Sequence, residues 1–260
     1  MINMKNQIRK AVLLSISILL LFPSISWSQT EENMINQVDN QGLKQGAWED
    51  VAGKNMSKGV YLNDVKEGQW ATFNQKDFMV KLENYKDGKL EGYVIQMDGR
   101  GYVKNMISYK DGLKHGAEIE YTFGGRIMGR KHYNHGKLDG GVKIYYDNGK
   151  MQETGTYKND LRDGITKWFD YDGNCIAEYQ YVEGSMQGIQ KAFYPEGQLL
   201  SEETFVDNAP VGERIEYHPN GQIKMRGSYK NAKRDGKWYQ YDNKGNQMTV
   251  HVYKLGELAK

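Results

Sequence analysis

The sequence has few of the residues that brace small exported domains or interrupt strands. It contains one Cys, Cys175, which cannot form an internal disulfide, and only 4 Pro in 260 residues. Hydrophobic residues make up 38% of the chain, and Phe occurs 7 times against 19 Tyr. A deep aliphatic core is therefore not expected. Tyr fits many half-buried positions instead, because its ring packs while its hydroxyl reaches water.

An apolar run lies near the N-terminus, over residues 11–22. Three cations precede it, a proline ends it, and the small residues within 26–28 resemble a signal-peptidase site. The run is shorter than the roughly 20 residues that span a membrane. We therefore predict a signal peptide over residues 1–28, cleaved near Ser28/Gln29, and export to the periplasm or the medium. An uncleaved signal anchor is the alternative.

The charge of the chain is nearly balanced. The formal net charge is +2, and removal of residues 1–28 takes away Lys5, Arg9 and Lys10 and leaves −1. Proteins that bind nucleic acid or anionic membranes carry a basic excess, which is missing here. We therefore expect no nucleic-acid partner.

Glycine is abundant, with 30 copies, and most of them recur every 24 residues. The first glycine column consists of Gly68, Gly92, Gly116, Gly140, Gly164, Gly188, Gly212 and Gly236, and a turn column of Gly101, Gly125, Gly149, Gly173, Gly197, Gly221 and Gly245. An aromatic column has the same spacing: Tyr61, Tyr85, Tyr109, Tyr133, Tyr157, Tyr181, Phe205, Tyr229 and Tyr253. Self-similarity at a fixed period indicates a repeat architecture.

Between the columns, apolar and polar residues alternate over short stretches, which predicts strands rather than helices. Loops such as 147–149 and 195–197 predict three-residue turns that end in a left-handed Gly, because Pro195 cannot take the positive φ of a type I′ turn. We predict an all-β fold: an elongated twisted antiparallel sheet of about nine stacked 24-residue hairpins over residues 43–260, about 85 Å long. Residues 29–42 are expected to form a flexible leader.

The pattern Tyr-x-x-Gly-x-x-x-Gly, with an aromatic five residues later and a turn glycine four beyond, resembles the MORN repeat. Good copies run over residues 85–101, 109–125, 133–149 and 181–197. They are most similar to the bacterial variant of the YwqK-like antitoxin family, and the resemblance implies a β-hairpin array used for protein or lipid contact. A third glycine column is interrupted by Asp160, Asn208 and Ala232. Since Ala tolerates the left-handed region poorly, we expect the connection at Ala232 to differ in shape.

Residues that could carry chemistry are few. His132 and His135 resemble half of a zinc site, which needs three or four protein ligands, so we interpret them as solvated turn residues. Cys175 shares its column with aliphatic residues and is expected to be a buried apolar residue rather than a nucleophile. Recurring aspartates are expected to serve turns rather than a calcium ladder: Asp87, Asp111, Asp139, Asp163 and Asp235. The sequence has no nucleophile elbow and no P-loop, so we predict no catalytic, cofactor-binding or metal-binding residue.

Two further sets of residues have a structural and a functional interpretation. Trp48, Trp70 and Trp238 lie in the first, second and last repeats, where we expect them to cap the ends; a glycan or peptide platform is the alternative. One repeat position carries Glu118, Thr166, Gln190 and Arg214. We interpret it as an exposed position. Its variation is compatible with one partner that contacts successive repeats along the array.

These features favour an exported, non-enzymatic repeat scaffold that binds a protein or an envelope surface, since repeat arrays present long surfaces for recognition. An antitoxin or immunity role, implied by the family resemblance, is one alternative. A glycan- or lipid-binding surface protein is another, and an enzyme is the least favoured. A protein partner is expected, no cofactor is expected, and the oligomeric state is left open.

Overall fold

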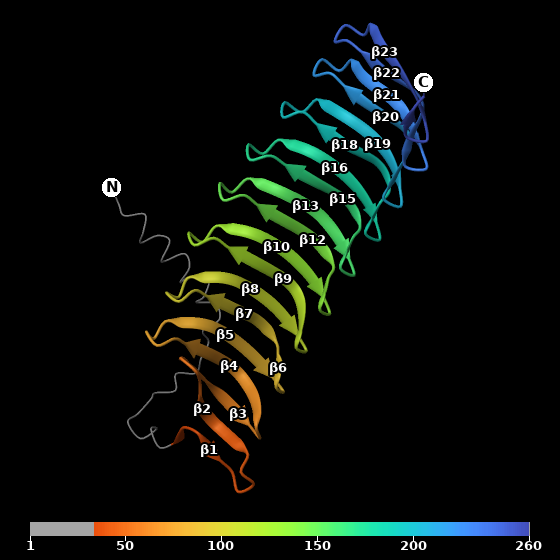
Figure 1. Cartoon of the computed structure of the whole chain (residues 1–260). Coiled ribbons are helices and arrows are strands. Elements are labelled where there is room, and N and C mark those ends of the chain that lie inside the picture. Colours follow the sequence, from red (N-terminus) through yellow and green to blue (C-terminus); the bar gives the residue numbers. More distant parts are fainter. Residues whose placement is uncertain (1–33, 260) are drawn as a thin grey trace, which may run out of the picture.

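The computed structural model describes residues 34–259, which form a single antiparallel sheet of 24 strands. Every pairing joins strands that are consecutive in the chain or have a single two-residue strand between them, so the sheet is a meander. Figure 1 shows the hairpins stacked in chain order along one long axis, from β1 at one end to β23 at the other. The described residues contain no α-helix, and accordingly no helix there is long and apolar enough to cross a membrane. The predicted all-β array of stacked hairpins is confirmed.

The strands keep the 24-residue period. The first are β1 (Gln37–Val38), β2 (Lys44–Ala52), β3 (Asn55–Leu62), β4 (Val65–Phe73), β5 (Met79–Lys86), β6 (Lys89–Leu90), β7 (Gly92–Met97) and β8 (Val103–Lys110). The middle ones are β9 (Leu113–Tyr121), β10 (Ile127–Asn134), β11 (Lys137–Leu138), β12 (Gly140–Tyr145), β13 (Met151–Lys158), β14 (Leu161–Arg162), β15 (Gly164–Phe169) and β16 (Cys175–Val182). The last are β17 (Ser185–Met186), β18 (Gly188–Phe193), β19 (Leu199–Val206), β20 (Ala209–Tyr217), β21 (Ile223–Lys230), β22 (Lys233–Tyr241), β23 (Gln247–Lys254) and β24 (Glu257–Leu258).

From residue 74 onward, the hairpin turns along one long side of the array have three residues. In the turn over 146–150, the amide of Gly149 donates to the carbonyl of Tyr146 at 2.9 Å, and the amide of Tyr146 donates to the carbonyl of Lys150 at 2.9 Å. Gly149 has a φ of +86°, which an L side chain rarely adopts. The turns at Gly197, Gly221 and Gly245 repeat this pattern. The predicted three-residue turns are therefore confirmed.

The hairpin turns along the opposite long side of the array have two residues. Both residues have positive φ, which is the type I′ geometry of tight hairpins. Asp87 (φ 48°) and Gly88 (φ 75°) are an example. The amide of Gly88 donates to the carbonyl of Lys66 at 3.1 Å, which ties this turn to the hairpin before it, and the equivalent bond recurs at Gly112, Gly136, Gly184 and Gly256. Where Asp160 replaces the glycine, its carboxylate accepts a bond from the amide of Leu138 at 2.7 Å. That bond offsets part of the cost of a left-handed side chain.

The structure corrects the prediction that the connection at Ala232 differs in shape. Ala232 has a φ of +59° and follows Asn231 at +51°, so this turn has the same type I′ shape as the others. The pairing of Lys230 with Lys233 closes the hairpin in the usual register. The register of β21 and β22 therefore holds Ala232 in a conformation that its own preference disfavours.

The predicted boundary between leader and array also needs correction. Gln37 and Val38 pair with Gln45 and Lys44, so β1 adds a short strand to the end of the sheet. The carboxylate of Asp39 accepts the amide of Leu43 at 3.0 Å, which closes the turn between β1 and β2. The part of the predicted leader over 37–42 is thus ordered against the array. Residues 29–33 and the predicted signal peptide, 1–28, lie outside the described residues.

Candidate interaction surface

The two faces of the sheet differ in how deeply their side chains are buried. Side chains alternate between faces along a strand. The face with the aromatic column, here called the buried face, holds all the buried side chains: Tyr61, Trp70, Glu83, Val94, Ile107, Glu118, Val142, Thr166, Tyr181, Gln190 and Trp238. The other face, here called the open face, carries exposed apolar residues such as Tyr93 and Ile165, at 49% and 54% exposure. The described residues thus form one layer with a line of buried side chains along one face.

Glycines on the buried face make room for large side chains from the next strand. A bulge at Gly68 (φ +65°) gives β4 two more residues than β3 between the pairs Val60–Glu67 and Lys58–Ala71. Trp70 lies in this bulge and folds back over Gly59. A Cβ at Gly59 would lie 2.2 Å from the indole of Trp70. Trp70 is fully buried, and its indole N–H donates to the carbonyl of Val60 at 3.2 Å.

The same arrangement recurs at the other end of the array. Trp238 lies over Gly227, where a Cβ would be 2.2 Å from the indole, and its N–H donates to the carbonyl of Ser228 at 3.3 Å. Trp238 is 1% exposed. Burial of Trp70 and Trp238 agrees with the capping interpretation and excludes both from an exposed glycan or peptide platform. Trp48, in the first repeat, is half-buried against Tyr61, with 5.6 Å between ring centroids.

Cations lie between the aromatic rings of successive repeats. The ammonium of Lys66 is 4.0 Å from the ring centroid of Trp70 and 5.3 Å from that of Tyr85. The guanidinium of Arg234 lies 4.2 Å from the ring of Trp238 and 5.5 Å from that of Tyr253. Such contacts add roughly 0.5–2 kcal/mol each, depending on exposure. They link neighbouring hairpins and occupy the ring faces that a ligand would need.

Acidic groups on the buried face are also engaged within the array. Glu118 is buried and pairs with Lys114 at 2.7 Å, and Arg162 pairs with Glu153 at 2.7 Å. Burial, together with the nearby carboxylate of Glu83, raises the pKa of Tyr85 to about 12. Burial and a hydrogen bond to Asp50 likewise raise the pKa of Tyr61 to about 12. Charges and hydroxyls on this face are therefore used for packing.

The structure corrects the interpretation of the variable repeat position. Glu118, Thr166 and Gln190 are 7%, 0% and 5% exposed, and Arg214 is half-buried. This position belongs to the same buried column as Trp70. Its variation follows the residue opposite it: Thr166 packs where Gly155 leaves space, and Arg214 bonds to Glu203 at 3.0 Å. It therefore cannot be read as a row of exposed recognition residues.

The histidines do not converge on a metal site. His132 Nδ1 lies 2.9 Å from the carbonyl of Asp139, whereas His135 Nδ1 lies 2.7 Å from Asn134 Oδ1. His135 occupies a left-handed turn position and packs against His115, with 5.1 Å between ring centroids. Within residues 34–259, no three His, Cys, Asp or Glu side chains are grouped to hold a metal ion.

The remaining sequence candidates have structural surroundings. Cys175 is half-buried, burial raises the pKa of its thiol, and its Sγ lies 3.6 Å from the carbonyl of Ala177. Asp87 and Asp111 take φ values of 48° and 51° in type I′ turns. Asp235 accepts the amide of Leu255 at 3.0 Å. Asp139 accepts the amide of Asn159, and Asp163 donates its own amide to the carbonyl of Thr156.

The open face has a feature that the sequence interpretation missed. A row of five apolar side chains crosses β4, β5, β7, β8 and β9, each paired with the next in the sheet register: Ala71, Leu82, Ile95, Met106 and Ile119. All five are half-buried, and only their neighbours in the sheet cover them. We call this set the apolar row. The same register continues through Arg130 and Lys143, both exposed.

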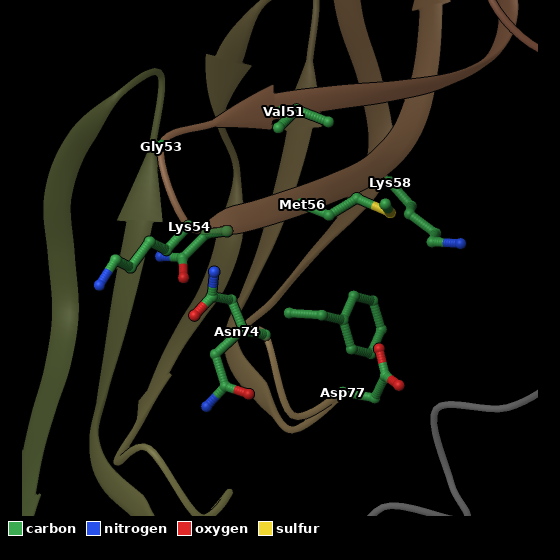
Figure 2. Close-up of a pocket in the computed structure, with 10 residues that line it drawn as sticks. Val51, Gly53, Lys54, Met56, Lys58, Asn74 and Asp77 are labelled. Atoms are coloured by element: carbon green, nitrogen blue, oxygen red, sulfur yellow. The ribbon is translucent and has the colours of Figure 1, made fainter.

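A hollow of about 570 Å³ lies beside the first end of the apolar row. Its apolar lining includes Val51, Met56 and Phe73, and Lys58, paired in register with Ala71, lies at its rim. Figure 2 shows Val51 and Met56 on adjacent strands, opposite the turn that carries Asn74 and Asp77. The hollow exists because the β2–β3 hairpin closes with the short turn Gly53–Lys54 and lacks a longer loop to cover Val51, which is 72% exposed.

The fold and its surfaces define a single-layer β-hairpin repeat array. The family model of the MORN repeat variant matches residues 138–159, 186–207 and 210–231, so these three stretches are similar to MORN-variant repeats. Among curated proteins, none matches the sequence. One solved structure with some similarity is the Tc holotoxin pore of Photorhabdus luminescens, at 9% identity and a TM-score of 0.18, over 79% of this chain and 14% of that one. A likeness of that size carries no argument about fold or function.

Proposed function

We propose that this protein is a non-enzymatic scaffold that binds another protein through a face of its sheet. The observation that carries the proposal is the uncovered open face, which presents apolar side chains over many adjacent strands in a fixed register. A sheet face of this kind is normally buried against a second layer. A face left open on a rigid array is suited to recognition, because repeat arrays hold extended surfaces in a defined shape.

The engagement of the reactive groups supports the same proposal. His132 and Asp235, two of the residues singled out above, bond to backbone groups within the described part of the chain. MORN repeats are a non-enzymatic repeat type that commonly serves protein or membrane binding. An enzyme would need a nucleophile or an acid–base pair placed around a substrate-sized cleft.

The test is a pull-down from extract of the host envelope with the full chain and with a variant that lacks residues 141–188. That deletion removes two whole repeats and joins Gly140 to Ile189, which restores the register of Gly188. The proposal expects a specific partner that crosslinks to residues of a sheet face. Recovery of no partner would contradict it, and turnover of a small substrate would favour an enzyme instead.

Export and an antitoxin role are separate proposals with separate tests. The apolar run over 11–22 motivates export, and mass spectrometry of the native protein should find an N-terminus near Gln29. The family resemblance motivates the antitoxin role, which expects the captured partner to be toxic when expressed without this protein. A harmless partner leaves the scaffold proposal standing and removes the antitoxin role.

A further inference from the structure

We infer that the apolar row and the adjoining hollow form one docking site for a partner protein segment that carries a short run of apolar side chains with acidic residues at one end. This inference rests on the proposed scaffold function and specifies its site and the chemistry of the partner. The steps that carry it are the continuity of the row, its length, and the charge at its far end.

The row is continuous across adjacent strands. Ala71 pairs with Leu82, Leu82 with Ile95, Ile95 with Met106, and Met106 with Ile119, so no polar side chain interrupts it. A flanking apolar line runs beside it, with Phe73 paired to Met79 and Met97 to Val103. Together they make an apolar band two side chains wide.

The length of the row limits the size of what it can hold. Five strands at about 4.8 Å spacing span about 20 Å. A segment that crosses them needs about 14 residues if helical or about 6 if extended. A second copy of the whole chain fits less well, since stable interfaces bury about 800 Å² per partner and a band about 20 Å long offers less than that.

The charge is asymmetric along the row. Beyond Ile119, the register places Arg130 and Lys143, both exposed and without an ionic partner among residues 34–259. At the other end, Lys58 is already paired with Glu49 at 2.6 Å, and Asp77 lines the hollow. An acidic group on the partner is therefore favoured at the Arg130 end, and an apolar side chain in the hollow.

The same register position later in the array provides the contrast. After Lys143 the register continues through Thr154 to Lys167 and Glu178, and the last two are hydrogen-bonded to each other. It then reaches Ile215, which lies between Glu202 and Arg226 and has no apolar neighbour in register. Ile215 occupies the same place in its repeat as Ile95, so it is a matched control for substitution outside the site.

The probes are two synthetic 14-residue amphipathic peptides with the same leucine face, one ending in three glutamates and the other in three lysines, measured by fluorescence anisotropy with the full chain. We expect the acidic peptide to bind and the basic one to bind more weakly. Ile95→Glu should weaken the acidic peptide about tenfold or more, because burial of one isoleucine is worth at least a factor of ten. Ile215→Glu should leave its affinity within about twofold.

A second variant does not depend on the packing of Ile95. Arg130→Glu combined with Lys143→Glu changes two exposed side chains and should reverse the preference between the two peptides. Equal binding of both peptides to all variants would overturn the site. Binding of phosphatidylcholine–phosphatidylglycerol vesicles or formation of a dimer, either one abolished by Ile95→Glu, would also overturn it by showing a different occupant.

The pull-down of the proposed function separates the two claims. If a partner is captured equally by the wild type and by Ile95→Glu, the scaffold function stands and this site is wrong. If no partner is captured and neither peptide binds, both fail.

Discussion

The tight contact between Gly59 and Trp70 makes a quantitative prediction. A methyl group at Gly59 would lie 2.2–2.5 Å from three atoms of an indole that is fully buried, so Trp70 must move if Gly59 becomes Ala. Overpacking of this kind costs about 1–3 kcal/mol. Displacement of the indole also loses its bond to Val60, which is worth about 1 kcal/mol. We therefore expect Gly59→Ala to destabilise the N-terminal repeats by about 2–4 kcal/mol.

The assay is urea unfolding combined with hydrogen exchange, because a repeat array can open locally without global unfolding. Gly141→Ala is the control, since a Cβ there has open space and no positive φ, and it should change stability by less than about 0.5 kcal/mol. Trp70→Val should relieve Gly59→Ala in the double variant, because Val94 and Val142 fill the same column in other repeats. If Gly59→Ala and Gly141→Ala behave alike, or if Trp70→Val gives no relief, the packing argument is refuted.

Three further predictions concern single residues. Tyr181→Ala should cost about 3 kcal/mol and release hydrogen-exchange protection in the middle of the array before its ends, and uniform loss of protection would contradict this. Ala232→Gly should stabilise the chain by about 1 kcal/mol in urea unfolding, because it removes a left-handed alanine; a loss of stability would contradict the turn geometry. Tyr61 favours the neutral phenol when folded, so its contribution to stability should be complete below about pH 10 and lost as the pH rises toward 12. Ultraviolet titration of wild type against Tyr61→Phe measures this, and ordinary titration of Tyr61 near pH 10 would refute it.

Much of the fold could be predicted from the sequence because the repeat is enforced by backbone geometry. The turn glycines such as Gly149 take φ values that other residues avoid, so they recur at a fixed spacing that is visible in the sequence. The aromatic column is visible for a similar reason, since Tyr61 and Tyr181 fill equivalent places. The prediction at Ala232 was wrong because the pairing of two strands outweighed the preference of one residue.

The face on which a residue lies was harder to predict. Glu118 and Gln190 are polar and variable, which is typical of exposed positions, yet they are 7% and 5% exposed on the buried face. The two residues that β9 holds in excess of β8 leave the alternation of side chains unchanged, so alternation alone places this column on the face of Tyr109, and the polar residue types concealed its burial. The apolar row was missed because its members come from two columns on different strands, such as Ile95 and Met106, whose register only the pairing reveals. The change from Ile119 to Lys143 at one repeat position was the available signal.

Small-angle scattering of the full chain tests the central claim most directly, namely that the described residues form one extended layer with an uncovered face. A rod about 85 Å long has a radius of gyration of roughly 26 Å. A compact domain of the same number of residues has a radius of about 17 Å. The account predicts a rod-like profile with the larger value at low protein concentration. A globular profile with a radius near the smaller value would contradict it, because the open face would then be covered by the chain itself.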